Sequence, residues 1–322
     1  MPAFKTVSVI YTLIIIAKKV NFSLSLCYNI IAKIYGGKMN IVPLSDALGA
    51  EVIGVNLKQP LSSDEVNEIK TAFLKYHLLC LRSDPLNPKQ FFDFSSHFGA
   101  PFSETTRSQW VDGLPQISKL DSTYKTDKDK PKNPILNRRS GWHTDHSFKE
   151  FPPKATMLHG HEIPTQGGHT CFCNTEKAYN DLPLETKERV EGLIAVHSYD
   201  TMRAPARAVK RTPEEIAETP DVEHPLIRVH DETGNKAIYF NSNRTDRIVG
   251  LERKESDLLL DDIHAHMTQK KYRYDHKWSV GDVVIWDNRC LIHSVNVDYP
   301  VGEHRIHLRT IIEGKKPFNQ SI

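Results

Sequence analysis

The most constraining feature of this chain is the pair His143 and Asp145, which is completed by a histidine far along the sequence, His293. Side chains at positions i and i+2 of an extended segment point to the same face of a sheet. His143 and Asp145 would therefore offer one imidazole and one carboxylate on the same face. With the second imidazole from His293, they would bind one side of a metal ion through three ligands. The fold must therefore bring two distant segments to one point.

Two imidazoles and one carboxylate bind a metal on one side and leave its remaining positions open. This triad is typical of non-haem Fe(II) oxygenases, in which a co-substrate and dioxygen must both reach the metal. His159 and His161 also share a strand face, but no matching carboxylate motif accompanies them. Asp287 could in principle supply the carboxylate instead. The first triad is therefore the predicted metal site.

Composition limits the partners of the chain. A net charge of +2 over 322 residues gives no reason to expect a polyanion partner. Residues 271–274 alternate basic and aromatic side chains, but the same alternation is expected of any half-buried strand. The five cysteines are odd in number and contain no Cys-x-x-Cys, which predicts reduced, buried thiols in a cytoplasmic protein. We therefore expect a small-molecule substrate and no nucleic acid.

The amino-terminal residues 1–38 differ from the rest. The apolar run from Val7 to Ala17 is short for a membrane span, and the pattern of a globular domain begins at Met39. Three explanations are compatible with this segment: a natural start at Met39, a membrane anchor and a targeting peptide. We do not expect the protein to bind a membrane. We predict that residues 1–38 lie outside the fold and that residues 39–322 form a single catalytic domain.

Local patterns predict many short strands and few helices. Ser62 with Glu65, and Asn87 followed by Pro88, are start signals for two helices near the amino end of the domain. Residues 122–140 read as a mobile loop that could act as a lid, and residues 201–224 as a long insertion. Short strands over most of the remaining chain favour a sandwich or jelly roll.

Several stretches, taken in order, resemble a known family. They are Trp142 to Phe148, Gly167 to Thr170, Thr245 to Ile248, Trp286 to Arg289 and Arg305 to Arg309. Over residues 40–318 the chain resembles the Fe(II)/2-oxoglutarate-dependent dioxygenases of the taurine dioxygenase and 2,4-dichlorophenoxyacetate dioxygenase family. The resemblance implies a mostly β fold with flanking helices, a double-stranded β-helix or jelly roll, with iron at one mouth of the barrel. It also implies a homo-oligomer.

The resemblance also assigns roles to single residues. His143, Asp145 and His293 would bind Fe(II). Arg305, with the hydroxyl of Thr170, would hold the distal carboxylate of 2-oxoglutarate, because a buried carboxylate needs a charge partner and arginine offers a planar, two-pronged one. The interval between His293 and Arg305 is one residue longer here than in the family.

The substrate pocket is predicted from the same resemblance. Arg309 would pair with the anionic group of the substrate, and three further residues would line the pocket: His146, Phe148 and Tyr239. After Phe98-Gly99 the taurine enzymes carry a histidine that helps to hold the sulfonate, whereas this chain carries Glu104 nearby. A carboxylate repels an anion, so we do not expect taurine itself to be the substrate, unless Arg107 compensates.

The implied reaction is oxidative. Dioxygen and 2-oxoglutarate would give succinate and CO2 while a substrate carbon next to a heteroatom is hydroxylated. Sulfonates, alkyl sulfates and aryloxyalkanoates are the expected small anionic substrates. Alternatives are the same chemistry on an amino acid, a betaine or a natural-product intermediate, or a non-catalytic jelly-roll binding protein. A zinc hydrolase would leave Arg305 and Thr170 unexplained.

Overall fold

The structure is a computed structural model that describes the chain except residues 1–38, 105–106, 131–140, 205–211 and 321–322. The predictions for residues 1–38, and for most of the lid loop, therefore concern segments outside the described residues. Residues 122–130 of that loop form no helix or strand. Among the described helices, none has the length and apolar character that crossing a membrane requires.

The larger sheet contains nine strands and forms one wall of a barrel. Its order is β1-β2-β3-β15-β7-β17-β6-β5, with β4 paired to β17, and only β2 and β3 run parallel among the recorded pairings. The bounds are β1 Asn40–Pro43, β2 Ala50–Ile53, β3 Leu78–Arg82, β4 Pro101–Phe102, β5 Trp110–Val111, β6 Leu114–Asp121, β7 Ala155–Glu162, β15 Asp282–Asp287 and β17 Ile306–Ile312.

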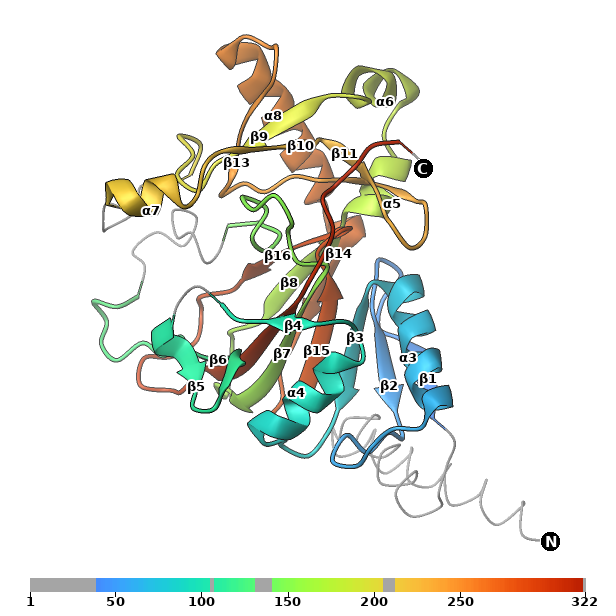
Figure 1. Ribbon diagram of the computed structural model, residues 1–322, viewed down its shortest axis with the longest axis vertical. Helices are drawn as coiled ribbons and strands as arrows, with labels where there is room; N and C mark the ends of the chain where they lie inside the picture. Colours follow the sequence, from blue (N-terminus) through green and yellow to red (C-terminus); the bar gives the residue numbers. More distant parts are fainter. Residues whose placement is uncertain (1–38, 105–106, 131–140, 205–211, 321–322) are drawn as a thin grey trace, which may run out of the picture.

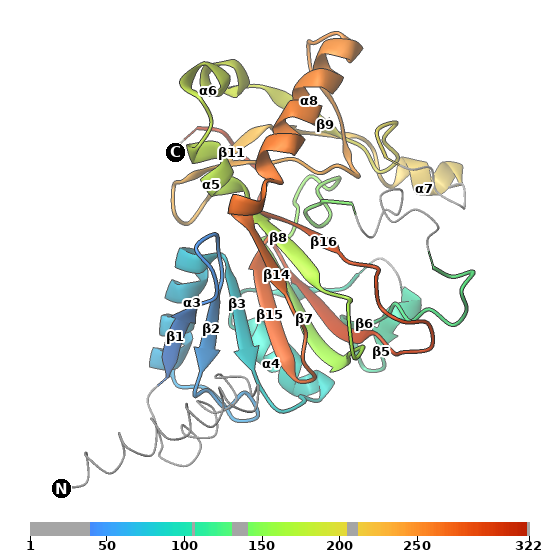
Figure 2. The same ribbon diagram turned by 180° about the vertical axis from the view of Figure 1, so that it is seen from behind.

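The opposite wall is a three-stranded sheet in the order β14-β8-β16. Its strands are β8 Thr170–Asn174, β14 Arg273–His276 and β16 Leu291–Val295. The two walls form separate layers, with the larger sheet in front in Figure 1 and the smaller one in front in Figure 2. Phe172 of β8 packs on Trp286 of β15 between them, with ring centroids 5.4 Å apart. This two-walled arrangement is the predicted jelly roll, which is confirmed.

Two helices cover the outer face of the larger sheet. They are α3, Ser63–Tyr76, and α4, Pro88–Ser96, and both begin where predicted, each with a capping box, at Ser62 and at Asn87. Their apolar sides place Phe73 and Phe91 in one buried cluster with Val283 of β15. Figure 1 shows both helices beside the sheet. The capping residues fix where each helix starts, and the sheet fixes which side it buries.

The remaining elements gather at one end of the barrel, above the strands in Figure 1. They are the helices α5 Thr175–Asn180, α6 Leu184–Val190, α7 Pro213–Ala217 and α8 Arg253–Met267, and the strands β9 Ile194–His197, β10 Val222–Pro225, β11 Ile227–Val229, β12 Lys236–Ile238 and β13 Thr245–Ile248. Two short 3-10 helices, Arg107–Gln109 and Lys270–Tyr272, complete the described elements. β11 and β12 pair as an antiparallel hairpin.

The predicted insertion at residues 201–224 carries regular structure that its sequence did not suggest. It contains α7 and most of β10, and β10 pairs with β9 from Val222 opposite His197 to Pro225 opposite Ile194. Proline has no amide hydrogen and usually marks an edge or the end of a strand. Here β10 is the edge strand of its sheet, so Pro225 loses no interior ladder hydrogen bond.

Candidate active site

The predicted metal ligands come together where β16 meets the segment before β7. His143 and His293 form an antiparallel β-bridge in which each amide donates to the other's carbonyl, at 2.9 and 2.7 Å. Asp145 lies in the turn that follows, and not on an extended strand as the spacing predicted. Its Oδ1 nevertheless lies 4.0 Å from His143 Nε2 and 3.9 Å from His293 Nε2. Three donor atoms therefore converge on one point.

Hydrogen bonds behind these donors hold them in orientation. The Thr156 hydroxyl donates to Asp145 Oδ2 at 2.6 Å, which leaves Oδ1 toward the two imidazoles. Asn288 Nδ2 donates to the same hydroxyl oxygen at 2.9 Å, and Trp286 Nε1 donates to Asn288 Oδ1 at 3.0 Å. His143 Nδ1 lies 2.7 Å from the Gly141 carbonyl, where it donates, so its Nε2 lone pair faces inward.

Burial sets the protonation of the ligand groups. It lowers the pKa of His143, and it lowers the pKa of His293 to about 3, so both imidazoles are neutral at neutral pH. Burial opposes ionisation of Asp145, but His293 and His143 hold the pKa of this carboxyl below its usual value. Neutral imidazoles and an ionised carboxylate are the forms that bind a divalent metal. The donor set therefore fits a metal ion without further change.

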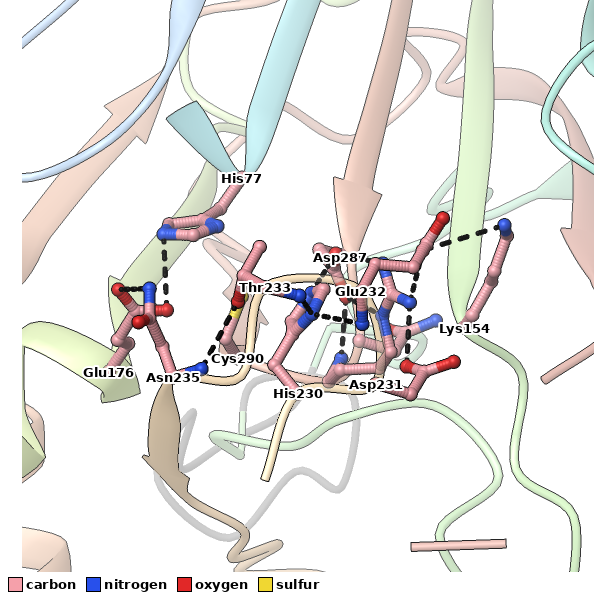
Figure 3. A network of polar contacts seen from close by, with 12 residues as sticks. His77, Lys154, Glu176, His230, Asp231, Glu232, Thr233, Asn235, Asp287 and Cys290 are labelled. Atoms are coloured by element: carbon pink, nitrogen blue, oxygen red, sulfur yellow. Dashed lines mark hydrogen bonds and ion pairs between the residues drawn. The ribbon is translucent and has the colours of Figure 1, made fainter. Parts of the chain in front are cut away.

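Within the part of the chain that the structure describes, three other groups of side chains have donor atoms close together, and in two of them the carboxylate already has protein partners. Asp287 bonds to His230 at 3.0 Å and to Arg289 at 2.7 Å, and Cys290 lies beside them (Figure 3). Asp282, grouped with Cys80 and His276, is bound by Arg82 at 2.7 and 2.8 Å. The third group is His77, Glu176 and Cys290, in which a thiol of raised pKa replaces the second imidazole.

His159 and Asp287, the alternatives raised by the sequence, have structural partners. His159 Nε2 accepts from the Leu86 amide at 2.9 Å, and its Nδ1 lies 3.1 Å from the Asp282 carbonyl. Both nitrogens of this ring are therefore used within the protein. Asp287 holds His230 under the loop that follows β11, as Figure 3 shows. Neither residue faces the triad.

Arg305 is buried at the start of β17, where neutral oxygen atoms orient its guanidinium. It donates to the Gly168 carbonyl at 3.1 Å and to Ser122 Oγ at 3.1 Å, and it lies over the Tyr299 ring. Thr170 lies on the opposite sheet, and its Oγ1 accepts from Trp278 Nε1 at 2.9 Å. Because Trp278 supplies that hydrogen, the Thr170 hydroxyl hydrogen is left for an acceptor. The proposed carboxylate-binding roles of both residues stay predictions.

Arg309 lies four residues further along β17 and contacts a carboxylate that the protein itself supplies. Its Nη2 forms an ion pair with Oε1 of Glu104. The Glu104 residue is only 3% exposed. The other oxygen, Oε2, lies 3.2 Å from His146 Nε2. Burial opposes ionisation of Glu104, but His146 and Arg309 hold its pKa below the usual value. Glu104 therefore stands as an anion between two predicted substrate-binding residues.

The other predicted pocket residues differ in where they lie. The Phe148 ring stacks on His146, with centroids 5.6 Å apart, and meets Tyr199 edge-on at 4.7 Å. Tyr239 is buried against His197, with centroids 5.5 Å apart, in a layer that also holds His224 and Arg228. A role in substrate binding stays a prediction for His146, Phe148 and Tyr239.

Arg107 does not compensate for Glu104. It is exposed in a 3-10 helix, where its guanidinium lies over the Trp110 ring at 5.8 Å. The expectation that it balances the carboxylate is therefore wrong. The positive charge that pairs with Glu104 comes from Arg309 on β17.

Sequence reasoning missed the residues that support the site from behind. Thr156 contacts a predicted metal ligand, and Ser122 and Trp278 contact the predicted 2-oxoglutarate residues. An isolated threonine in a strand carries no signal of its contacts. Asn288 could have been identified from the sequence, because it lies inside the Trp286 to Arg289 stretch that resembles the family.

The jelly roll and the convergence of two imidazoles and one carboxylate are the arrangement expected of a 2-oxoglutarate-dependent dioxygenase. The sequence comparison agrees with this class. Residues 40–311 match the family described as taurine catabolism dioxygenase TauD, TfdA family. The chain belongs to this family.

Two curated relatives match along most of their length. The alkylsulfatase of Acinetobacter baylyi is 33% identical over 289 residues, covering 86% of this chain and 86% of the relative. The alpha-ketoglutarate-dependent 2,4-dichlorophenoxyacetate dioxygenase of Cupriavidus pinatubonensis is 30% identical over 260 residues, covering 78% and 90%. Alpha-ketoglutarate is 2-oxoglutarate.

Solved structures agree with the fold. A taurine dioxygenase from Burkholderia xenovorans superposes with a TM-score of 0.75 at 31% identity, covering 88% of this chain and 92% of its own. AAD-2 in complex with Mn(II) and N-oxalylglycine gives 0.73 at 28%, covering 87% and 99%. The protein is thus an oxidoreductase of the 2-oxoglutarate-dependent dioxygenase class, which uses a metal ion and 2-oxoglutarate.

Proposed function

We propose that the metal is Fe(II), that the oxidant is O2, and that the protein hydroxylates a small anionic organic substrate at a carbon next to a heteroatom. The observation that carries this proposal is the convergence of His143 Nε2, Asp145 Oδ1 and His293 Nε2 on one side of one point. Such a set leaves the far side of a metal open to a co-substrate and dioxygen. Iron would supply the oxygen activation, with 2-oxoglutarate giving succinate and CO2.

The residues of the chain would bind and orient the reactants. By bonding to Oδ2 of Asp145, Thr156 would leave Oδ1 to hold the metal, and the Gly141 carbonyl would keep His143 in the matching tautomer. Arg305, oriented by Ser122 and Gly168, would receive the distal carboxylate of 2-oxoglutarate, with Thr170 as a second donor. The aromatic rings of Phe148 and Tyr199 would exclude water from the substrate side.

The substrate class is supported by Arg309 and by the relatives. An arginine near the metal ligands offers a partner for an acid group, and it is close enough to lower the pKa of Asp145. The names of two relatives refer to alkyl sulfates and to 2,4-dichlorophenoxyacetate, an aryloxyalkanoate. We therefore propose a sulfonate, an alkyl sulfate or an aryloxyalkanoate. We also propose a cytoplasmic homo-oligomer, in keeping with four buried free thiols among the described residues.

The proposal is tested by succinate formation. Protein loaded with Fe(II) without oxygen is given 2-oxoglutarate, oxygen and a panel of sulfonates, alkyl sulfates, aryloxyalkanoates and amino acids. We expect succinate above the substrate-free background with at least one anionic class, and loss of this signal in His143→Ala. Metal binding without any turnover of 2-oxoglutarate would favour a non-catalytic binding protein, and turnover at background level with every compound would reject the proposed substrates.

A further inference from the structure

A second group of donor side chains, outside the proposed iron site, lies where three segments distant in the sequence meet. His77 caps the carboxyl end of α3, Glu176 lies in the first turn of α5, and Cys290 lies between β15 and β16. One donor atom from each residue lies within 4.8 Å of the other two. Figure 3 shows Cys290 between the His77–Glu176 pair and the network around Asp287. The three donors are therefore close enough for a single ion to bind them.

Backbone hydrogen bonds hold the three segments together. The Asp287 amide donates to the His77 carbonyl at 2.9 Å, which joins the end of α3 to β15. The Thr175 amide donates to the Cys290 carbonyl at 2.9 Å, which joins the start of α5 to the turn before β16. The fold therefore positions these side chains by itself, and a ligand would not have to bring the segments together.

Polar atoms of this group lack partners of their own. Asn235 donates to Oε1 of Glu176 at 2.9 Å, but Oε2 of Glu176 and Nδ1 of His77 have no hydrogen bond to any residue that the structure describes. Nε2 of His77 lies 3.6 Å from Oε2, which is too far for a hydrogen bond. Burial lowers the pKa of His77, which is 6% exposed, so its imidazole is neutral at neutral pH. Buried polar atoms are nearly always paired, so these atoms require a further partner.

A cavity of about 330 Å³ gives access to this group. His77 and Glu176 form part of its wall, together with two lysines, Lys75 and Lys177. Lys177 Nζ donates to a backbone carbonyl at 2.9 Å, and Lys75 Nζ lies 5.0 Å from the centre of a tyrosine ring. Because Lys75 is exposed, the cavity reaches the surface. An ion and a water molecule can therefore enter from solvent.

The charges and the donor types favour a divalent cation that prefers sulfur. Burial and the carboxylates of Asp287 and Glu176 raise the pKa of the Cys290 thiol, and a bound cation would reverse this effect by favouring the thiolate. One thiolate and one carboxylate balance two positive charges. Arg289, the nearby cation, is already paired with Asp287 at 2.7 Å. Thiolate, imidazole and carboxylate are ligands of zinc, whereas Mg²⁺ and Ca²⁺ prefer oxygen.

We propose that His77, Glu176 and Cys290 form a second metal site, which binds Zn(II) with a water molecule from the cavity as the fourth ligand. The bound ion joins the end of α3, the start of α5 and the turn before β16. β16 carries His293, so the second site stabilises the position of a strand that also serves the proposed iron site. The role of the zinc is structural and does not involve the oxidation chemistry.

The test uses Co(II), which replaces Zn(II) in such sites and gives a near-ultraviolet charge-transfer band when a thiolate binds it. Reduced full-length protein is loaded with Mn(II) and N-oxalylglycine without oxygen, titrated with Co(II) and then with Zn(II). We expect the band to saturate at one equivalent of Co(II) per chain and Zn(II) to abolish it. Co(II) that displaces Mn(II) at His143, Asp145 and His293 adds no such band, because that group contains no thiolate.

Variants assign the band to the proposed ligands. Cys290→Ser should abolish it, and Glu176→Gln, which changes the shape very little, should raise the Kd for Co(II) at least about a hundredfold, because removing a ligand costs more than removing a residue behind one. Cys80→Ser is the matched control. Cys80 is equally buried in another group of donors, whose carboxylate Asp282 is already bound by Arg82, so the band should remain. Binding of Mn(II) and N-oxalylglycine reports that each variant is folded.

Three results would overturn the inference. The first is a native protein without the thiolate band, and the second is a band that survives in Cys290→Ser. The third is an unchanged Kd for Co(II) in both Glu176→Gln and His77→Ala, which would place the ion with His230 and Asp287 instead. If Cys290→Ser does not fold, the Kd of Glu176→Gln decides the question, because this variant leaves the buried thiol in place.

Discussion

Replacing Thr156 by valine should weaken metal binding while preserving the shape of the core. Threonine and valine have nearly the same volume, so the change removes one hydroxyl from a residue that is 0% exposed. That hydroxyl donates to the Asp145 carboxylate at 2.6 Å and accepts from Asn288 at 2.9 Å. Valine would free Oδ2 of Asp145 to rotate and would leave the Asn288 amide without this acceptor.

The magnitude follows from these two contacts. A hydrogen bond to a charged group contributes about 1.5–3 kcal/mol, and loss of a residue behind a metal ligand weakens metal binding about tenfold to a hundredfold. We expect the Kd for Mn(II), measured by calorimetry or by the free-ion resonance signal, to rise by that factor. The Kd for N-oxalylglycine at saturating Mn(II) should change much less, because Arg305 and Thr170 are untouched.

Thr310→Val is the matched control. Thr310 lies on the neighbouring strand β17 and is also 0% exposed, but its hydroxyl has no hydrogen-bond partner among the described residues. Removing it should leave Mn(II) affinity unchanged and the stability equal or slightly higher. A Thr156→Val protein that binds Mn(II) within twofold of the native one would show that the hydroxyl does not orient the carboxylate, and the reasoning would fail.

Three further changes test other parts of the structure. Arg305→Ala should raise the KM for 2-oxoglutarate at least about thirtyfold, since a buried carboxylate loses its charge partner; an unchanged KM in succinate assays would refute the assignment. Arg289→Ala should lower the free energy of unfolding in urea by about 3–5 kcal/mol, because Asp287 is left buried without its cation. Asp287 has a depressed pKa, so its contribution is complete above the unfolded pKa of 3.8 and is lost as the pH falls toward the folded value, which acid titration of the native protein can follow. Ser62→Ala should cost about 1 kcal/mol in the same urea assay through loss of the α3 cap, whereas no loss would mean that the cap is not formed in solution.

Much of the fold could be predicted because its signals are local. A capping residue and its partner lie three positions apart, as in Ser62 with Glu65, so both helices on the larger sheet begin where expected. The strand β10 was missed, because its pairing with β9 depends on a segment that its own sequence does not specify.

The convergence of the three proposed metal ligands could also be predicted, although Asp145 lies in a turn. His143 and His293 meet because an antiparallel bridge joins them, and this long-range contact was inferred from the family pattern and not from local signals. The carboxylate reaches the same point because Thr156 and the turn orient it. The sequence supplied the identity of the donors, and the fold supplied their direction.

The sequence by itself determined which chemical groups are available: two imidazoles, one carboxylate, two arginines and a glutamate where the taurine enzymes carry a histidine. Only the tertiary structure decided that Glu104 lies between Arg309 and His146, and that Arg107 lies over the Trp110 ring. The physical reason is that these residues lie on separate segments, and strand register and chain direction fix which side chains meet. Backbone pairing over the whole barrel sets that register, so no single motif carries it.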